Sequence, residues 1–172
     1  MDAVALIRSQ TKVAHDWLEG TMEDVSPEMA HHLPPGVAHP IGSRYAHQAV
    51  AEDNLIAMVK HSPSLYTTSW LGKTGIPDPN PAFNSPTEWA RSVQLDMAAL
   101  RQYSQAVYAN TDAYLGYLKE SDLDSEIDLS QWGVGKWQLG AFLVSFVLGH
   151  THDMMGEISA LKGVQGAKGY PF

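Results

Sequence analysis

The chain has 172 residues, no cysteine, and 19 acidic against 11 basic residues, which is a formal net charge of −8 at pH 7. The absence of cysteine excludes disulfide frameworks, cysteine-containing zinc sites, iron–sulfur clusters and thiol nucleophiles, whereas 8 histidines remain as metal ligands. The acidic balance argues against a nucleic-acid partner, and the length predicts one domain over residues 1–172.

Two features bear on membranes and location. The N-terminal segment has an acidic residue, Asp2, and no basic stretch before an apolar one, so no signal peptide is predicted. The longest apolar run covers residues 139–148, and a run of about ten residues is too short for a membrane span. We therefore expect no membrane partner and a cytoplasmic protein.

Two helices are predicted in the first third of the chain. Residues 2–22 repeat apolar side chains along one stripe, as an amphipathic helix does, and His15 lies at its border, either at the mouth of a bundle or in a surface or packing role. Residues 41–60 predict a second helix whose inner face includes His47. Glu52 and Asp53 lie off that face, and we expect them to be solvated or paired in salt bridges.

The next segment, residues 62–86, is rich in proline and glycine and shows no periodicity. Loops without structure of their own rarely exceed about 12–15 residues. Because this one also contains Leu65, Tyr66, Trp70 and Ile76, we expect a packed cover or a functional lid.

Two further helices are predicted in the second half. Ser85, Pro86 and Glu88 supply an N-cap, a proline at the first helical position and a glutamate three residues after the cap, and periodicity continues to about residue 119. Residues 127–129 alternate as a short extended piece would, and residues 136–162 repeat apolar positions at helical spacing. The sequence therefore predicts an all-α fold, a four-helix bundle with a long crossover between helices 2 and 3.

Two histidines interrupt apolar helical faces, His47 on the second long helix and His150 on the last. They are either buried, hydrogen-bonded imidazoles or two ligands of a metal site, since imidazole is the commonest protein metal ligand. Met154 follows His150 by one turn, and its thioether suits Cu(I) better than Zn²⁺ or Ni²⁺. Asp153, His152 or water are the alternatives for a third ligand, although His152 is about 200° around the helix.

The stretch from His150 through Met154 to residues 156–158, Gly-Glu-Ile, resembles the last helix of DinB/YfiT-like proteins, which carries His-x-x-x-His followed by x-Gly-Gln/Glu-Ile. Residues 40–42, Pro-Ile-Gly, lead to His47 as in the family's second helix. The resemblance implies a four-helix bundle, commonly a homodimer, with Ni²⁺ or Zn²⁺ on three histidines. His47 and His150 match the first two ligands, and Met154 stands where the third histidine would be.

Two classes of function follow. The first is a metal-dependent enzyme on an unknown small-molecule substrate, either a hydrolase or a transferase that uses a low-molecular-weight thiol, as the resemblance implies. The second is a metal-free bundle that binds a small ligand or serves as a structural or stress-response dimer.

Overall fold

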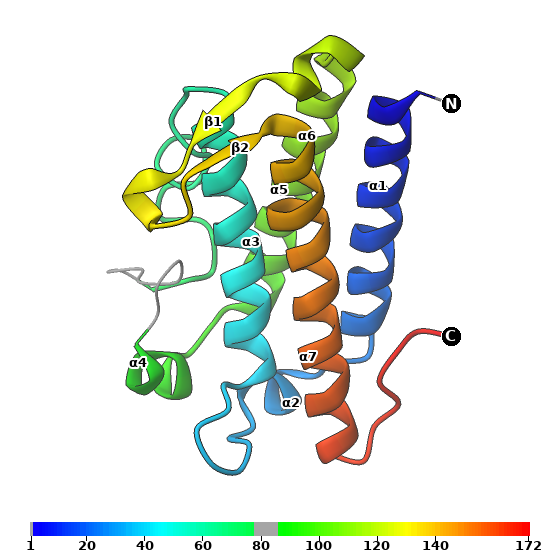
Figure 1. Cartoon of the computed structure of the whole chain (residues 1–172). Coiled ribbons are helices and arrows are strands. Elements are labelled where there is room, and N and C mark those ends of the chain that lie inside the picture. Colours follow the sequence, from blue (N-terminus) through cyan, green and yellow to red (C-terminus); the bar gives the residue numbers. More distant parts are fainter. Residues whose placement is uncertain (1, 78–85) are drawn as a thin grey trace.

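The computed structural model describes residues 2–77 and 86–172, and it confirms the all-α four-helix bundle (Figure 1). Three long helices are α1 (Ala3–Met22), α3 (Ile41–Val59) and α5 (Met97–Tyr117). The fourth is a rod of three segments: α6 (Leu139–Phe142), the π-helical η4 (Leu143–Gly149) and α7 (His150–Val164). Two short helices, α2 (Pro27–His31) and α4 (Thr87–Ser92), lie in the connections.

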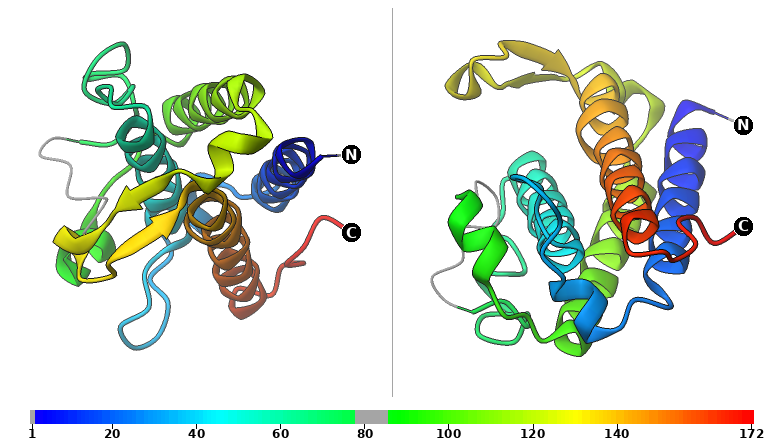
Figure 2. Two further views of the ribbon diagram at one scale, coloured as in Figure 1. Left: turned by 45° about the horizontal axis from the view of Figure 1, so that its top comes forward. Right: turned by 90° about the horizontal axis from the view of Figure 1, so that it is seen from below.

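The order of the helices around the bundle explains the long crossover. α1 and α3 each pack against α5 and α7, so α1 and α3 are diagonal to one another (Figure 2). α3 and α5 run in the same direction, whereas α1 and α7 run in the opposite one (Figure 1). Consecutive parallel helices need a connection that returns the full helix length, about 30 Å for 20 residues. The segment between Val59 and Met97 makes this return.

The predicted third helix over residues 85–119 is wrong in one respect, because the chain forms two helices there. Extended backbone at Val93 ends α4, and the Asp96 carboxylate then caps α5. The intervening amides bond elsewhere: Leu95 N donates to His31 Nε2 at 3.0 Å and Asp96 N to the Gly75 carbonyl at 2.9 Å. The predicted N-cap, Ser85, lies outside the described residues.

The predicted fourth helix over residues 136–162 begins later than expected and contains a π-helical segment. β2 (Lys136–Gln138) occupies the expected first turn and pairs antiparallel with β1 (Glu126–Asp128). The extended piece predicted over residues 127–129 is therefore confirmed, one residue earlier in the chain. Two 3-10 turns, η2 (Glu120–Asp124) and η3 (Ser130–Trp132), flank β1. The π segment ends at Gly149, and beyond it Thr151 rather than His150 is the fully buried position.

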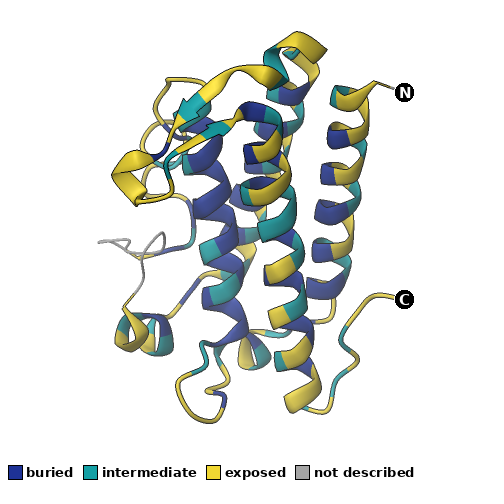
Figure 3. Ribbon diagram, viewed as in Figure 1, coloured by how far each residue is buried: buried dark blue, intermediate teal, exposed yellow. Residues whose placement is uncertain are grey.

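The apolar core consists of two clusters, one toward each end of the bundle. α3 is buried over most of its length and contributes to both (Figure 3). The first cluster includes Leu18, Tyr45, Tyr103, Met155 and Ile158. The second includes Ile7, Ile56, Leu115, Phe142 and Val147.

The crossover segment packs on the bundle, as its apolar residues predicted. Leu65, Tyr66 and Trp70 pack against the first cluster, and the Trp70 ring lies 5.8 Å from that of Tyr103 on α5. Within residues 2–77 and 86–172, none of the helices combines the length and apolar character that a bilayer crossing requires.

Candidate functional site

The structure brings His47 of α3 and His150 of α7 together. Their ring centroids are 5.2 Å apart and the rings meet edge to face at 81°. Burial lowers the pKa of His150, and the neighbouring His47 lowers it further. His150 Nε2 is buried and has no hydrogen-bond partner in the part of the chain that the structure describes. The pair therefore offers an unprotonated imidazole with one ring nitrogen unfilled.

The candidates for a third ligand fall in different surroundings. Met154 is buried, with 6% of its surface exposed, one turn beyond His150. Asp153 is exposed. The ring of His152 meets Trp17 of α1 edge to face at 6.2 Å, so it lies in the seam between α1 and α7. Across residues 2–77 and 86–172, no three histidine, aspartate or glutamate side chains form a group that could hold a metal ion.

An ion pair crosses the same seam between α3 and α7 near the histidines. Arg44 Nε lies 2.8 Å from Glu157 Oε2. Arg44 precedes His47 by three residues, about one helical turn, whereas Glu157 follows His150 by seven residues, about two turns. The positive charge of Arg44 also helps to lower the pKa of His150, after burial and His47.

A buried polar layer crosses the centre of the bundle next to the histidine pair. Glu52, 1% exposed, is its hub. Its Oε2 lies 2.9 Å from His15 Nε2 and accepts from Gln48 Nε2 at 3.0 Å, and its Oε1 accepts from Thr111 at 2.6 Å. Gln48 Nε2 also donates to Thr151 Oγ1 at 2.8 Å. These five residues, here called the central polar layer, come from all four long helices and separate the two apolar clusters.

The central polar layer is directly connected to the segments that carry the histidines. Gln48 follows His47 and Thr151 follows His150, so their hydrogen bond ties α3 to α7 beside the two imidazoles. The Thr151 hydroxyl donates in turn to the carbonyl of Val147 at 2.9 Å, within the π segment. The π segment ends at Gly149, directly before His150, and π-helical turns recur at functional sites.

Of the two alternatives expected for Glu52 and Asp53, solvation is wrong for both, while Glu52 lies at ion-pair distance from His15 and Asp53 forms no salt bridge with the described residues. Asp53 is fully buried and accepts from the backbone N–H groups of Leu65 and Tyr66 at 2.9 and 2.8 Å and from the Tyr103 hydroxyl at 2.7 Å. The error arose because α3 is covered by α5, by α7 and by the crossover segment, so no single apolar stripe marks its buried side. Burial first, and then the charge of Asp53, raise the pKa of Tyr103, which keeps the phenol a donor.

His15 lies at the opposite side of the layer, toward the seam between α1 and α5. It is 6% exposed, and its ring stacks on Tyr108 of α5 with centroids 4.0 Å apart. This corresponds to the packing role among the sequence alternatives, with a polar bond to Glu52 added. A signal for the layer was present in the sequence, since Thr111 and Thr151 each fall on an apolar helical stripe and His15 lies at the border of one.

Comparisons with known proteins agree with this architecture. The family model of the DinB superfamily matches residues 10–158 of the chain. A crystal structure of a conserved protein from Enterococcus faecalis is similar, with a TM-score of 0.80 and 23% sequence identity. The similarity covers 95% of this chain and 97% of that one, and at this identity it shows the fold. No curated protein matches the chain.

Proposed function

Because the chain belongs to the DinB superfamily, we propose that it is a DinB-type metal-dependent enzyme whose centre is formed by His47 and His150, with Met154 as the third ligand. The observation that carries this proposal is the approach of the two imidazoles to 5.2 Å, with His150 Nε2 buried and unpartnered among the described residues. Buried polar atoms are ordinarily satisfied, so an unfilled ring nitrogen beside a second imidazole fits a ligand role.

Two imidazoles and a thioether should bind Zn²⁺ or Ni²⁺ with lower affinity than three imidazoles would. Two imidazole nitrogens suit Zn²⁺, Ni²⁺ or copper, and a thioether adds a soft, weak donor. With three protein ligands, a coordination position stays open for water or substrate. A divalent ion held there supplies Lewis acidity toward a substrate oxygen or a bound water. The reaction we propose is hydrolysis, or transfer that involves a low-molecular-weight thiol, on a small-molecule substrate.

The protein's own residues have defined tasks in this proposal. Burial keeps His150 unprotonated at neutral pH, so its ring nitrogen is available for binding. The hydrogen bond between Gln48 and Thr151 fixes the spacing of the two helices beside the ligands.

Metal analysis and one substitution test the proposal. Untagged protein is analysed for Ni, Zn, Cu, Fe and Mn, and Zn²⁺ and Ni²⁺ affinities are measured by calorimetry. Met154→His restores a third imidazole and should tighten Zn²⁺ or Ni²⁺ binding at least about tenfold. His150→Ala should abolish binding. His32→Ala, which removes an exposed imidazole far from α7 in sequence, is the matched control and should change nothing.

The contrary outcome identifies the second class of function. If the wild type and Met154→His both hold less than about a tenth of an equivalent of metal and show no thermal shift on metal addition, the metal centre is refuted. The chain is then a metal-free bundle for a small ligand or a structural role. We also propose a cytoplasmic homodimer, and light scattering that gives the monomer mass of 18.8 kDa would contradict the dimer.

A further inference from the structure

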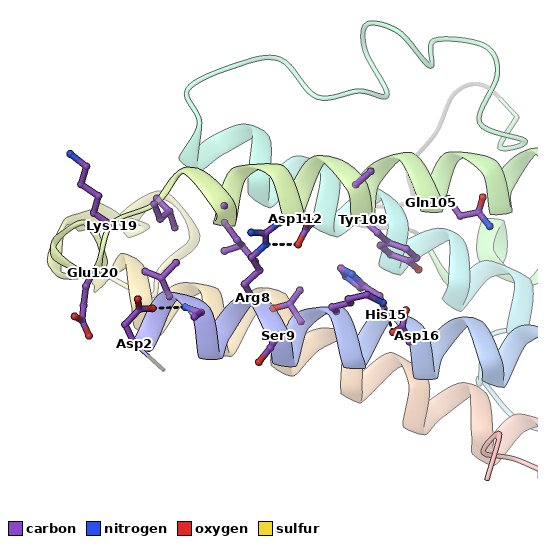
Figure 4. A pocket seen from close by; sticks show the side chains of 18 of the residues that line it. Asp2, Arg8, Ser9, His15, Asp16, Gln105, Tyr108, Asp112, Lys119 and Glu120 are labelled. Carbon is purple, nitrogen blue, oxygen red and sulfur yellow. Dashed lines mark hydrogen bonds and ion pairs between the residues drawn. The ribbon is translucent and has the colours of Figure 1, made fainter.

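A groove between α1 and α5 is separate from the histidine centre. It encloses about 950 Å³, and its walls come from α1, α5 and the residues that flank them, with none from α3 or α7. Figure 4 shows Arg8 and Asp112 meeting from opposite walls, and His15 and Tyr108 facing one another farther along. Its volume lies at the upper end of the range of small-molecule pockets.

The wall of the groove contains a buried polar group that the protein does not satisfy. Thr11 lines the groove, is 2% exposed, and its hydroxyl has no hydrogen-bond partner within the described ranges. His15, one turn farther along α1, also lines the groove, and its Nε2 is hydrogen-bonded to Glu52 of the central polar layer. An unsatisfied buried hydroxyl costs about 1–3 kcal/mol.

The charges that line the groove decide the sign of the ligand. Two of the cations are already neutralised: Arg8 makes a two-pronged ion pair with Asp112, and Lys12 pairs with Asp16. Glu19 is different, because it makes no ion pair with any residue in the described part of the chain. At Arg8 and Lys12 an anionic ligand would have to displace a carboxylate. The remaining lysine of the lining, Lys119, lies at the far end of the groove, away from His15 and Tyr108 (Figure 4). Beside Tyr108, a cation finds the Glu19 carboxylate open.

Two tyrosines hold the Glu19 carboxylate in place. Tyr45 and Tyr108 donate their hydroxyl protons to Glu19 Oε1 at 2.6 and 3.2 Å. Burial raises the pKa of both phenols, and the charge of Glu19 raises it further, so both stay protonated donors at every physiological pH. Both bonds go to the same oxygen, which leaves Oε2 for a ligand.

We propose that the groove between α1 and α5 binds a small organic ammonium ion, with its nitrogen at Glu19 and its hydrocarbon part along the apolar wall. Nearest to Glu19 that wall consists of the Tyr108 ring and Ala109, whereas Val4, Ala5, Leu115 and Leu118 line the far end of the groove, beyond the Arg8–Asp112 pair. The proposal does not depend on a metal at His47 and His150.

Three probes of equal length test the charge preference. Hexylammonium, hexanoate and 1-hexanol are titrated into ¹⁵N-labelled protein, and dissociation constants are taken from amide chemical shifts. We expect hexylammonium to bind at least about fivefold more tightly than 1-hexanol and hexanoate to bind most weakly. The amide resonances of Thr11 and His15 should shift on titration, and those of His47 and His150 should not.

Matched variants separate Glu19 from general charge effects. Glu19→Gln keeps an oxygen that accepts from both tyrosines, so the fold is retained while the charge is removed, and the hexylammonium advantage should vanish. Glu23→Gln makes the same charge change on an exposed residue outside the groove and should keep the advantage. His150→Ala should also keep it, which distinguishes failure here from failure of the metal centre. Equal binding of the three probes, or an advantage that survives Glu19→Gln, overturns the proposal.

Discussion

Replacing Glu52 by alanine should be among the most damaging single changes in this protein. The carboxylate is 1% exposed and is bonded by three side chains: His15, Gln48 and Thr111. Each buried donor left without an acceptor costs about 1–3 kcal/mol. Gln48 keeps its bond to Thr151, so two donors, on His15 and Thr111, lose their acceptor and the expected loss is about 2–6 kcal/mol. That is a large part of a typical unfolding free energy of about 5–15 kcal/mol.

Urea denaturation followed by helical circular dichroism measures this loss. Glu52→Gln keeps one acceptor oxygen and should lose only about 1–3 kcal/mol, so the two variants should rank in that order. Glu157→Ala is the matched control, because its carboxylate is 45% exposed and, among the described residues, forms an ion pair with Arg44 alone. This change should cost less than about 1 kcal/mol. If Glu52→Ala costs no more than this control, Glu52 does not organise the central polar layer and the reasoning is refuted.

Three further predictions follow from other parts of the structure. Burial lowers the pKa of His150, so the unfolded chain takes up this proton first and the unfolding free energy should fall as pH drops below about 6.5; melting temperatures from pH 8 to 5 should fall less steeply for His150→Gln. Gly75 has a φ of +77° and a Cβ there would overlap the Asp96 carbonyl oxygen, so Gly75→Ala should cost about 2–4 kcal/mol. Gly72 has a φ of +71° in open space, so Gly72→Ala should cost only about 1 kcal/mol in urea denaturation, and equal costs would contradict the steric argument. Asp53→Asn takes away one of the two oxygens that accept from the crossover amides of Leu65 and Tyr66, and it should lower the free energy of unfolding by about 1–3 kcal/mol. Unchanged hydrogen exchange of these two amides would contradict the idea that Asp53 holds the crossover segment on α3.

Periodicity located α1 and α3 well, and it misplaced boundaries in the other two long helices, where hydrogen bonds outside the helix compete with helical ones. α1 and α3 agree with the ranges predicted from their apolar spacing. The break before α5 was not visible, because it depends on Asp96 N bonding to Gly75 and Leu95 N bonding to His31, contacts that only the folded crossover creates. The π segment was missed for a similar reason, since the spacing of apolar residues there also suits a regular α-helix.

The sequence by itself determined the all-α bundle and its long crossover, and it singled out His47 and His150 as the two histidines on inner helical faces. The helical spacing of apolar residues is a local property that the sequence displays directly. Apolar faces of different helices pack against one another in a bundle, so two imidazoles on such faces are expected to lie in the same interior. Only the tertiary structure decided the burial of Glu52, the role of Asp53 and the groove between α1 and α5. His15 and Glu52 are 37 residues apart, and Gln48 and Thr151 are 103 apart. Such contacts depend on which elements cover each helix in the folded protein. The spacing of apolar residues identifies one buried face of a helix, and it does not identify further faces that other elements cover.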